Sequence, residues 1–502
     1  MKRRFYAPAV LLVGLLCAQA VATVHVYHSN LALQKNTLVI ARTGYLAVPN
    51  AYVAKGLDQL TIAFAGGLFF TLSIGAGLSV LTLAAVWLWN RVFRRRRRAL
   101  TAGLLTWFVL IGAANGNGWN PAASAYLVMV PLATALAAMH LMPARTTLIT
   151  PAGIFWPVAA ILVLAVLWGL VLDNQMFVTI RDHLLLGNRV GIGIARAYYG
   201  YTLYPAETFR PIDQRQLRTC GLDKSLDRSS RNRIERISRM NDCLPVPDGA
   251  FADMTFSRAD GTPARLALQH KGKTVMRVAA KELFGNPHKV LAAFSERLDR
   301  NRNFRKMTLA GLLLGFPLVL FTLAFSLLGA LPNLFLPVAL ADMLTAVICV
   351  GLGTLLLVPV YRGHNAAVAA DNPGTALSTG SPAIRIQALQ AACKQKRDIT
   401  AAALKHGIDK SAHVAERYWL ARSLANARHL QAPSLLMQLA ADREPIVACQ
   451  ALWAMGKRGN RGKVPDIMER INTSPHWYVQ MYGYRALRSL GWVQPRSPQV
   501  AY

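Results

Sequence analysis

The stretch that decides the fold class is residues 60–89, LTIAFAGGLFFTLSIGAGLSVLTLAAVWLW. It holds no charged residue and no histidine over 30 positions. As a helix it would be about 45 Å long, whereas the hydrocarbon core of a bilayer is about 30 Å thick. A helix of this length can cross a membrane if it tilts or projects from the bilayer. The stretch therefore predicts a membrane-spanning helix.

Six further apolar runs predict additional spans, which gives about seven in all. They are Phe5–Thr23, Ala99–Ala114, Pro121–Met142, Pro151–Leu172, Met307–Leu331 and Leu334–Val360. The run Ala99–Ala114 is short for a span, but it is followed by the turn-forming residues Asn115-Gly116-Asn117-Gly118 and forms a natural hairpin with the next run. The only formal charge inside the seven runs is Asp342.

The first run admits two interpretations. It follows Lys2-Arg3-Arg4 and contains Ala18-Gln19-Ala20 near its end. A basic start, an apolar centre and an A-x-A sequence are typical of a removable signal peptide. The run is also long enough to stay as a first span. Both interpretations place the following residues outside the cytoplasm.

Charge and apolar content are segregated along the chain. The 502 residues include 56 Lys and Arg against 24 Asp and Glu, a net charge of +32, yet only 16% are charged and 53% are hydrophobic. This composition excludes an ordinary cytosolic enzyme, a disordered basic protein and a small disulfide-rich secreted domain. It favours an α-helical polytopic membrane protein that carries basic extramembrane parts.

The arginines around the second run set the expected orientation. Arg91 and Arg94 through Arg98 follow it directly, and cytoplasmic loops are enriched in Lys and Arg. With seven spans in a bacterial-type inner membrane, both large soluble regions are then extracytoplasmic. If the third run does not cross, both become cytoplasmic. Arg302, Arg305, Lys306 and Arg362 on the expected outer side argue for that alternative.

The predicted organisation follows from these runs. We expect a signal peptide or first span (1–23), an extracytoplasmic loop (24–59), a four-helix membrane region (60–172) and a basic domain (174–306). A two-span hairpin (307–360), a linker (362–380) and helical repeats (381–495) follow. The loop is expected to start as a strand-like run that contains His25 and His28.

Residues 174–306 predict a small α+β domain. They carry 24 Lys and Arg against 13 Asp and Glu, a net charge of +11. Phe251–Arg258 and Arg265–Val278 are expected to be strands, with turns at Asp260-Gly261 and Lys271-Gly272. Asn286-Pro287 is expected to begin a helix with a stripe of Val290, Leu291, Phe294 and Leu298. Four tyrosines suit a membrane interface: Tyr198, Tyr199, Tyr201 and Tyr204.

Cys220 and Cys243 are the only cysteines of this domain. In an oxidising compartment they could form a disulfide, which would contribute about 3 kcal/mol in the chain-entropy description. Two unrelated thiols are the alternative.

The C-terminal region contains a repeat of 30–33 residues. Its recurring positions are Ile384, Val414, Val447 and Val479, each followed seven residues later by alanine, at Ala391, Ala421, Ala454 and Ala486. Second helices are expected over Asp398–Asp409, Ala432–Arg443 and Val464–Ser474. Small alanines let paired helices approach closely, and the apolar residue fills the seam between pairs, so the pattern predicts an α-solenoid.

Residues 444–456 (EPIVACQALWAMG) and 474–491 resemble the first helix of HEAT repeats. The first two units depart from the pattern, because Tyr418 and Trp419 stand where small residues are usual. The resemblance implies a protein-interaction surface, with protein partners bound by the repeats, and it implies no reaction.

No catalytic, cofactor-binding or metal-binding motif is found, so whether the protein is an enzyme stays open. Asp342 is a candidate functional residue, because intramembrane carboxylates are costly and often functional. His140 in the fourth run is its candidate partner by chemistry alone.

The leading hypothesis is a membrane-anchored scaffold or recruitment factor. A transporter or channel that uses Asp342 is the alternative, and a membrane enzyme acting on lipid or glycan is the third. Two basic regions, residues 174–306 and 362–502, favour acidic proteins or anionic lipid headgroups as partners over nucleic acid.

Overall fold

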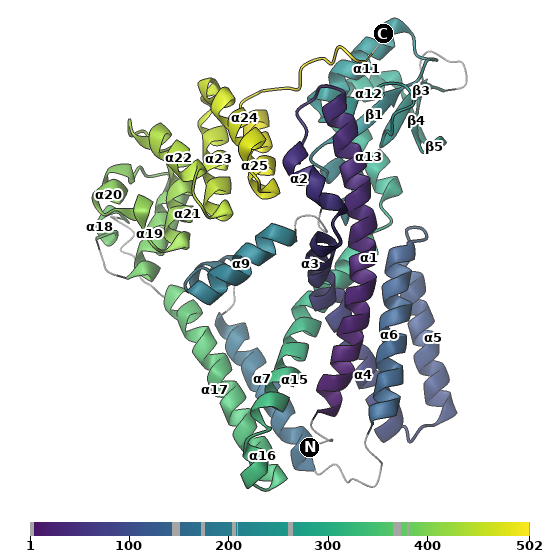
Figure 1. Ribbon diagram of the computed structural model, residues 1–502, viewed down its shortest axis with the longest axis vertical. Coiled ribbons are helices and arrows are strands. Elements are labelled where there is room, and N and C mark those ends of the chain that lie inside the picture. Colours follow the sequence, from purple (N-terminus) through teal and green to yellow (C-terminus); the bar gives the residue numbers. More distant parts are fainter. Residues whose placement is uncertain are drawn as a thin grey trace. The chain divides into compact units, whose positions relative to one another are not determined.

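The computed structural model describes residues 5–142, 151–171, 176–202, 207, 209–259, 265–364, 373–378 and 381–500. The chain divides into two compact units, which are described separately (Figure 1). Unit 1 comprises residues 1–28, 60–179 and 300–364, and unit 2 comprises residues 29–59, 180–299 and 365–502. Each unit is thus assembled from three separate stretches of the chain.

Seven helical stretches of the described residues are long and apolar enough to cross a membrane, which confirms the number expected from the sequence. They are α1 (Tyr6–Arg42), α3–α4 (Leu60–Arg91), α5 (Arg97–Ala114), α6 (Pro121–Leu141), α7 (Pro151–Val171), α14–α15 with the short α16 (Arg302–Phe335), and α17 (Val338–His364). The short third run forms α5, and its hairpin to α6 is closed by Asn115, whose Oδ1 accepts from the backbone N–H of Asn120 at 2.7 Å.

Glycines allow the central helices of unit 1 to touch through their backbones. Two π-helical turns, η2 (Thr71–Gly75) and η5 (Gly311–Gly315), pack against each other. A Cβ added to Gly311 would lie 2.4 Å from the carbonyl oxygen of Ser73, and one on Gly315 would lie 2.4 Å from the Cα of Gly77. The glycine-rich part of residues 60–89 is therefore a packing surface.

The first helix corrects the expected loop over 24–59. Helix α1 continues without a break to Arg42, so His25 and His28 lie on a helix and not on a strand. The strand interpretation relied on alternation over five residues, which is too short to exclude a helix. Ala18-Gln19-Ala20 lies inside α1, where the Nε2 of Gln19 donates to the carbonyl of Phe64 and its Oε1 accepts from Thr71.

The middle part of unit 2 is an α+β domain built on a five-stranded sheet of order β2-β1-β3-β4-β5. The strands are β1 (Arg218–Leu222), β2 (Cys243–Pro245), β3 (Met254–Arg258), β4 (Arg265–His270) and β5 (Lys273–Ala279). Strand β1 pairs in parallel with β2 and β3, while β3, β4 and β5 are antiparallel. The parallel part, with helix α11 (Arg228–Met240) before β2, was not expected from the sequence.

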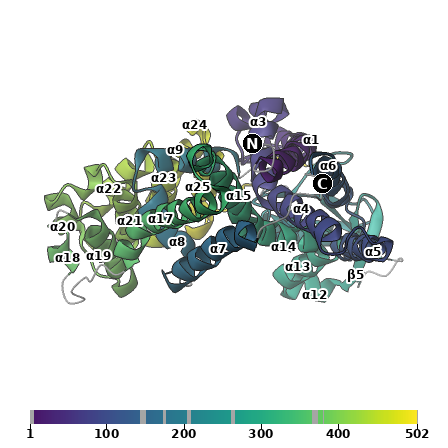
Figure 2. The ribbon, with the colours of Figure 1, turned by 90° about the horizontal axis from the view of Figure 1, so that it is seen from below.

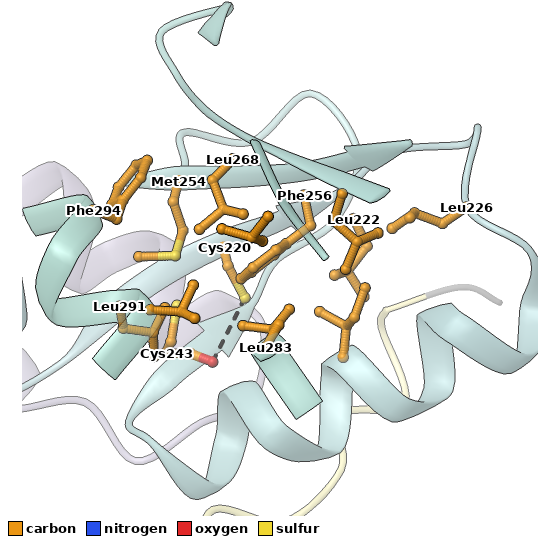
Figure 3. Close-up of a cluster of buried hydrophobic side chains, with 14 of the residues drawn as sticks. Cys220, Leu222, Leu226, Cys243, Met254, Phe256, Leu268, Leu283, Leu291 and Phe294 are labelled. Atoms are coloured by element: carbon orange, nitrogen blue, oxygen red, sulfur yellow. Dashed lines mark hydrogen bonds between the residues drawn. The ribbon is translucent and has the colours of Figure 1, made fainter. Parts of the chain in front are cut away.

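The predicted strands and C-terminal helix of this domain are confirmed. Lys271 and Gly272 both have positive φ, as a two-residue hairpin turn requires, whereas Asp260-Gly261 lies outside the described residues. After the short helix α12 (Ala280–Gly285), Asn286 caps α13 (Pro287–Leu298) by accepting from the N–H of Lys289. The stripe of α13 packs on the sheet, with Leu291 and Phe294 in the hydrophobic core (Figure 3).

Cys220 and Cys243 lie in this core as free thiols, so the structure does not contain the disulfide considered above. The two residues occupy neighbouring parallel strands, and the Sγ of Cys220 donates to the carbonyl of Cys243 at 3.6 Å (Figure 3). Burial raises the pKa of the Cys220 thiol well above its usual value, mainly because the thiolate would be desolvated.

The C-terminal part of unit 2 is a stack of helix pairs, as predicted (Figures 1 and 2). First helices α19 (Pro382–Gln395), α21 (Val414–Ser423), α23 (Pro445–Arg458) and α25 (Trp477–Ser489) pack on one another in this order. Second helices are α20 (Thr400–Lys405), α22 (Ala432–Ala440) and α24 (Val464–Thr473). Helix α20 is shorter than expected, because Gly407 turns the chain with φ of +63°.

The repeat-defining residues of the last three units are buried: Val414, Val447, Val479, Ala421, Ala454 and Ala486. Ile384 and Ala391 are only half-buried, because α19 begins the stack and presents Ile386, Leu389 and Ala392 to the core instead. A Cβ on Gly456 would lie 2.8 Å from the Cα of Ala486, so small residues do set the helix separation.

The packing of η2 on η5 predicts that Gly311→Ala destabilises the purified protein, because the added methyl group cannot fit against the backbone of Ser73. Overpacking of this kind costs about 1–3 kcal/mol. The measurement is thermal unfolding in detergent. Gly103→Ala in α5 is the control, since nothing lies within 4 Å of its added Cβ. Equal melting temperatures for the two variants would contradict the packing.

The free thiols predict that denatured, unreduced protein takes up one more maleimide than its Cys220→Ser variant. The native protein should leave Cys220 unlabelled, because it is fully buried and the pKa of its thiol is raised. Intact-mass spectrometry measures the number of bound maleimides in the denatured and in the native protein. If the unreduced, denatured protein labelled neither Cys220 nor Cys243, a disulfide would join them.

Candidate functional site

The loop after α1 is tied to the last helix pair of the solenoid through Asn50. The Nδ2 of Asn50 lies 3.1, 3.0 and 3.4 Å from the carbonyl oxygens of Ile471, Asn472 and Ser474. These carbonyls end helix α24, where a helix leaves its last carbonyls without intrahelical partners. The Oδ1 of Asn50 at the same time accepts from the N–H of Val53 and caps α2 (Ala51–Lys55). One buried side chain therefore ends one helix and begins another.

Two glutamines extend this tie. The Oε1 of Gln480 accepts from the N–H of Asn50 at 2.8 Å, and its Nε2 donates to the carbonyl of Ser474. Gln494 pairs with the backbone of Leu46 through both its amide oxygen and its amide nitrogen, at 3.0 and 2.8 Å. Residues 43–50 form a strap across the C-terminal repeat, which we call the N-terminal strap.

Helix α25, the last of the first helices, is also fixed to the α+β domain, through Asp242. The hydroxyl of Tyr484 donates to the carboxylate of Asp242 at 2.7 Å, and the guanidinium of Arg488 lies 3.1 Å from the same oxygen. Burial raises the pKa of Asp242, while the contacts with Tyr484 and Arg488 oppose that rise. Strap, α+β domain and solenoid thus form one connected body.

A segment upstream of the α+β domain runs along the first helices of the solenoid. Its π-helical turn η3 (Arg181–Leu185) places the guanidinium of Arg181 4.1 Å from the ring centroid of Tyr418. The buried carboxylate of Asp182 accepts from the Nε1 of Trp419 at 2.7 Å and from the Nε2 of Gln390 at 3.3 Å. A buried carboxylate needs such partners, so this contact is specific.

Helix α9 (Arg189–Tyr201) continues the same segment. Arg196 forms a two-bond ion pair with Glu444, whose side chain is almost fully buried, and the ring of Tyr199 lies 5.4 Å from that of Tyr478. Gly191 is required at the turn into α9, because a Cβ there would lie 2.2 Å from the carbonyl oxygen of Leu185. Residues 181–199, which we call the docking segment, thereby touch all four units of the solenoid.

Beside the docking segment, aromatic and arginine side chains of the first helices form a ladder that we call the aromatic–arginine ladder: Trp419, Arg422, Trp453, Tyr482 and Arg485. The guanidinium carbon of Arg422 lies 5.5 Å from the ring centroid of Trp419 and 4.8 Å from that of Trp453. Arg485 lies 5.9 Å from the ring of Tyr482. Arg485 is exposed and the other four are half-buried, so a partner can reach them.

The chemistry of the ladder suits a protein partner. Tryptophan, tyrosine and arginine contribute most of the binding energy at protein interfaces, and a guanidinium can hold a carboxylate with two hydrogen bonds. Burial raises the pKa of Tyr482, so its phenol is neutral and leaves the arginine charge uncompensated. The sequence contained a signal for this surface: Tyr418 and Trp419 were the residues that departed from the repeat pattern.

Asp342 is buried in the first turns of α17, which packs on α7 and α15. His140 is exposed on α6, which packs on α4 and α5. The two residues therefore lie on helices with different main neighbours. Among the described residues there is no group of three or more histidine, cysteine and acidic side chains able to hold a metal ion.

Residues 401–488 match the family of HEAT repeats. The match confirms the resemblance that the sequence pattern indicated and covers three of the four units seen in the structure. HEAT repeats in general serve as surfaces for protein–protein interaction. No curated protein and no solved structure matches the chain.

The N-terminal strap predicts that Asn50→Asp destabilises unit 2. Aspartate keeps the oxygen that caps α2 but cannot donate to the carbonyls of α24. Unpaired buried carbonyls cost about 1–3 kcal/mol, and the carboxylate would also be repelled by them. Limited proteolysis in detergent measures the change, with cleavage expected to rise within 464–500. Asn286→Asp, the same change at the exposed cap of α13, is the control. An unchanged cleavage pattern would mean that the strap does not hold the repeat.

Proposed function

We propose that the protein is a multi-pass protein of a bacterial-type inner membrane that holds unit 2 on the extracytoplasmic face and uses its HEAT repeats to recruit a protein partner. The observation that carries the recruiting role is the aromatic–arginine ladder. It combines the residue types of binding hot spots with accessible positive charge on a repeat surface.

The assembly of unit 2 supports one topology. The hydroxyl of Thr219 donates to Asn36 at 3.2 Å, and Asn50 bonds to the last repeat. Residues 29–59, 180–299 and 365–502 form one compact unit, which in a membrane protein would lie on one side of the bilayer. Four long apolar stretches lie between Leu60 and Val171, and four crossings return the chain to its starting side. Without a crossing by α5, only three would remain, and the hydrogen-bonded residues would lie on opposite faces.

The arginine block then assigns the side. Arg94 through Arg98 lie between α4 and α5, so one proposed crossing, α3–α4, separates them along the chain from residues 29–59. Because Lys and Arg accumulate in cytoplasmic loops, the block is cytoplasmic and unit 2 is outside. This assignment keeps α1 as a retained span, since Gln19 in its centre bonds to α3 and η2.

An acidic segment of a protein is the partner that the ladder fits best. Residues 362–502 carry 19 Lys and Arg against 8 Asp and Glu, a net charge of +11. Carboxylates of the partner would pair with Arg422 and Arg485, and its apolar side chains would cover the rings of Trp453 and Tyr482. The docking segment borders the ladder and limits the space on that side.

Sidedness can be measured by cysteine labelling with a membrane-impermeant maleimide on bacterial spheroplasts. Leu430→Cys, at a position 96% exposed in unit 2, should be labelled without lysis. Arg96→Cys, exposed between α4 and α5, should be labelled only after lysis. The unsubstituted protein gives the background. The reverse pattern would place unit 2 in the cytoplasm and overturn the assignment.

The recruiting role predicts that Arg422→Glu combined with Trp453→Ala reduces recovery of acidic partners by at least ten-fold in cross-linking pull-downs from membranes, because charge and ring contact are lost together. Arg428→Glu is the matched control, since it makes the same charge change at an exposed position outside the ladder. Partner recovery equal to that of the unsubstituted protein, with melting temperature unchanged, would refute the role of the ladder.

A further inference from the structure

Helix α9 has two faces of different character. One face is occupied within unit 2: Gly191 lies against the backbone of Leu185, Ala195 is buried, and Tyr199 packs on Tyr478. Arg196 at its edge is paired with Glu444. These contacts fix the rotation of the helix about its axis, so the other face is set as well.

The other face is an apolar stripe that faces away from the rest of unit 2. Val190, Ile194, Tyr198 and Tyr201 are 74, 57, 52 and 40% exposed. Their spacing of four, four and three residues aligns them on one side of a helix. Of the exposed residues between them, Gly193 and Ala197 are small, and Arg196 is paired with Glu444. We call this set the α9 stripe.

The stripe lacks the residues that keep a surface helix soluble. Residues 186–202 contain no Asp or Glu, and their only charged residues are Arg189 and Arg196. A solvated helix face normally presents charged side chains. Exposing aligned valine, isoleucine and tyrosine to water is instead unfavourable, because their apolar surface stays hydrated. Something apolar is therefore expected to cover the stripe.

We propose that the α9 stripe lies in the interface of the lipid bilayer, so that α9 is an in-plane helix that carries the HEAT repeats on its opposite face. The proposal rests on the proposed membrane topology. Val171, the end of the α7 span, is separated from Arg189 by 17 residues, so α9 begins close to the point where the chain leaves the membrane.

The composition of the stripe selects lipid as the occupant. Tyrosine rings suit the depth where hydrocarbon meets headgroups, with the hydroxyl directed to water. Arginine beside an apolar face is typical of helices that lie on anionic membranes, and Arg189 is exposed at the start of α9. Unit 2 is also held near the bilayer by chain passages at both its α7 and α17 connections, which raises the local concentration of lipid around the stripe.

The function of the repeats follows from this position. The face of α9 opposite the stripe bonds to Glu444 and Tyr478. A helix fixed in the interface would therefore hold the first helices of the solenoid at a set distance from the headgroups. The aromatic–arginine ladder beside it would be presented to partners at the membrane surface.

Spin labels test the proposal on the full chain in nanodiscs of phosphatidylcholine and phosphatidylglycerol. A label on Ile194→Cys should be accessible to oxygen and shielded from a water-soluble nickel chelate. A label on Leu430→Cys, exposed in the solenoid, should behave in the opposite way. We expect the oxygen-to-nickel accessibility ratio to be several-fold higher at 194, and the same result at Val190→Cys.

A label on Leu162→Cys, exposed on the apolar helix α7, separates the two levels of the argument. If 162 lies in lipid while 194 is open to nickel, the stripe is solvated and this proposal fails alone. If 162 is open to nickel, the membrane topology itself fails. Shielding of 194 from both reagents would mean that a protein covers the stripe, and would also overturn its assignment to lipid.

Discussion

The architecture depends on one buried side chain, Asn50, because it joins parts of the chain that are more than 400 residues apart. Its amide donates to the carbonyls that end α24, its oxygen caps α2, and its backbone N–H bonds to Gln480. A single hydrogen bond contributes only about 1 kcal/mol. Here each bond also satisfies a helix terminus that would otherwise be left unpaired in a buried place. Closing the strap therefore helps to join three separate chain segments into one compact unit.

The docking segment restrains the solenoid in a second way. A repeat array is held mainly by contacts between neighbouring units, so its curvature is soft. Residues 181–199 cross all four units, from Gln390 through Tyr418 and Glu444 to Tyr478. Tying distant units to one rigid segment makes the first-helix surface preorganised, which lowers the entropy that a partner must lose on binding. It also occupies part of that surface, so the aromatic–arginine ladder beside it is the part that stays accessible.

The sequence predicted the features that recur or run long. Seven apolar runs predicted the seven long apolar helices, and the valine and alanine repeat marked the solenoid because its last three units bury the same positions. The strap was missed, because Asn50 carries no local pattern and its partners lie at 471–480. The extension of α1 to Arg42 was missed because polar residues such as Asn30 and Asn36 hide a helix that is buried in unit 2. Parallel pairing of β1 was missed because β2 has three residues. Tertiary contacts, which no window of residues contains, decided all three.

The distribution of charge in unit 2 argues for an external source of negative charge. Its buried carboxylates are already used inside the fold: Asp182 by Arg181, Glu416 by Arg385, Asp442 by Arg417 and Glu444 by Arg196. Pairing the buried acids in this way leaves a surplus of arginine at the surface of the described part of unit 2. Lipid phosphates and partner carboxylates can both neutralise such arginines. The aromatic rings of the ladder distinguish a protein partner from a lipid phosphate. A flat indole face gains most binding energy from a side chain that covers it and excludes water. Arginines that alternate with such rings therefore favour a protein, whereas an apolar stripe beside an exposed arginine, as at Arg189 of α9, favours a bilayer.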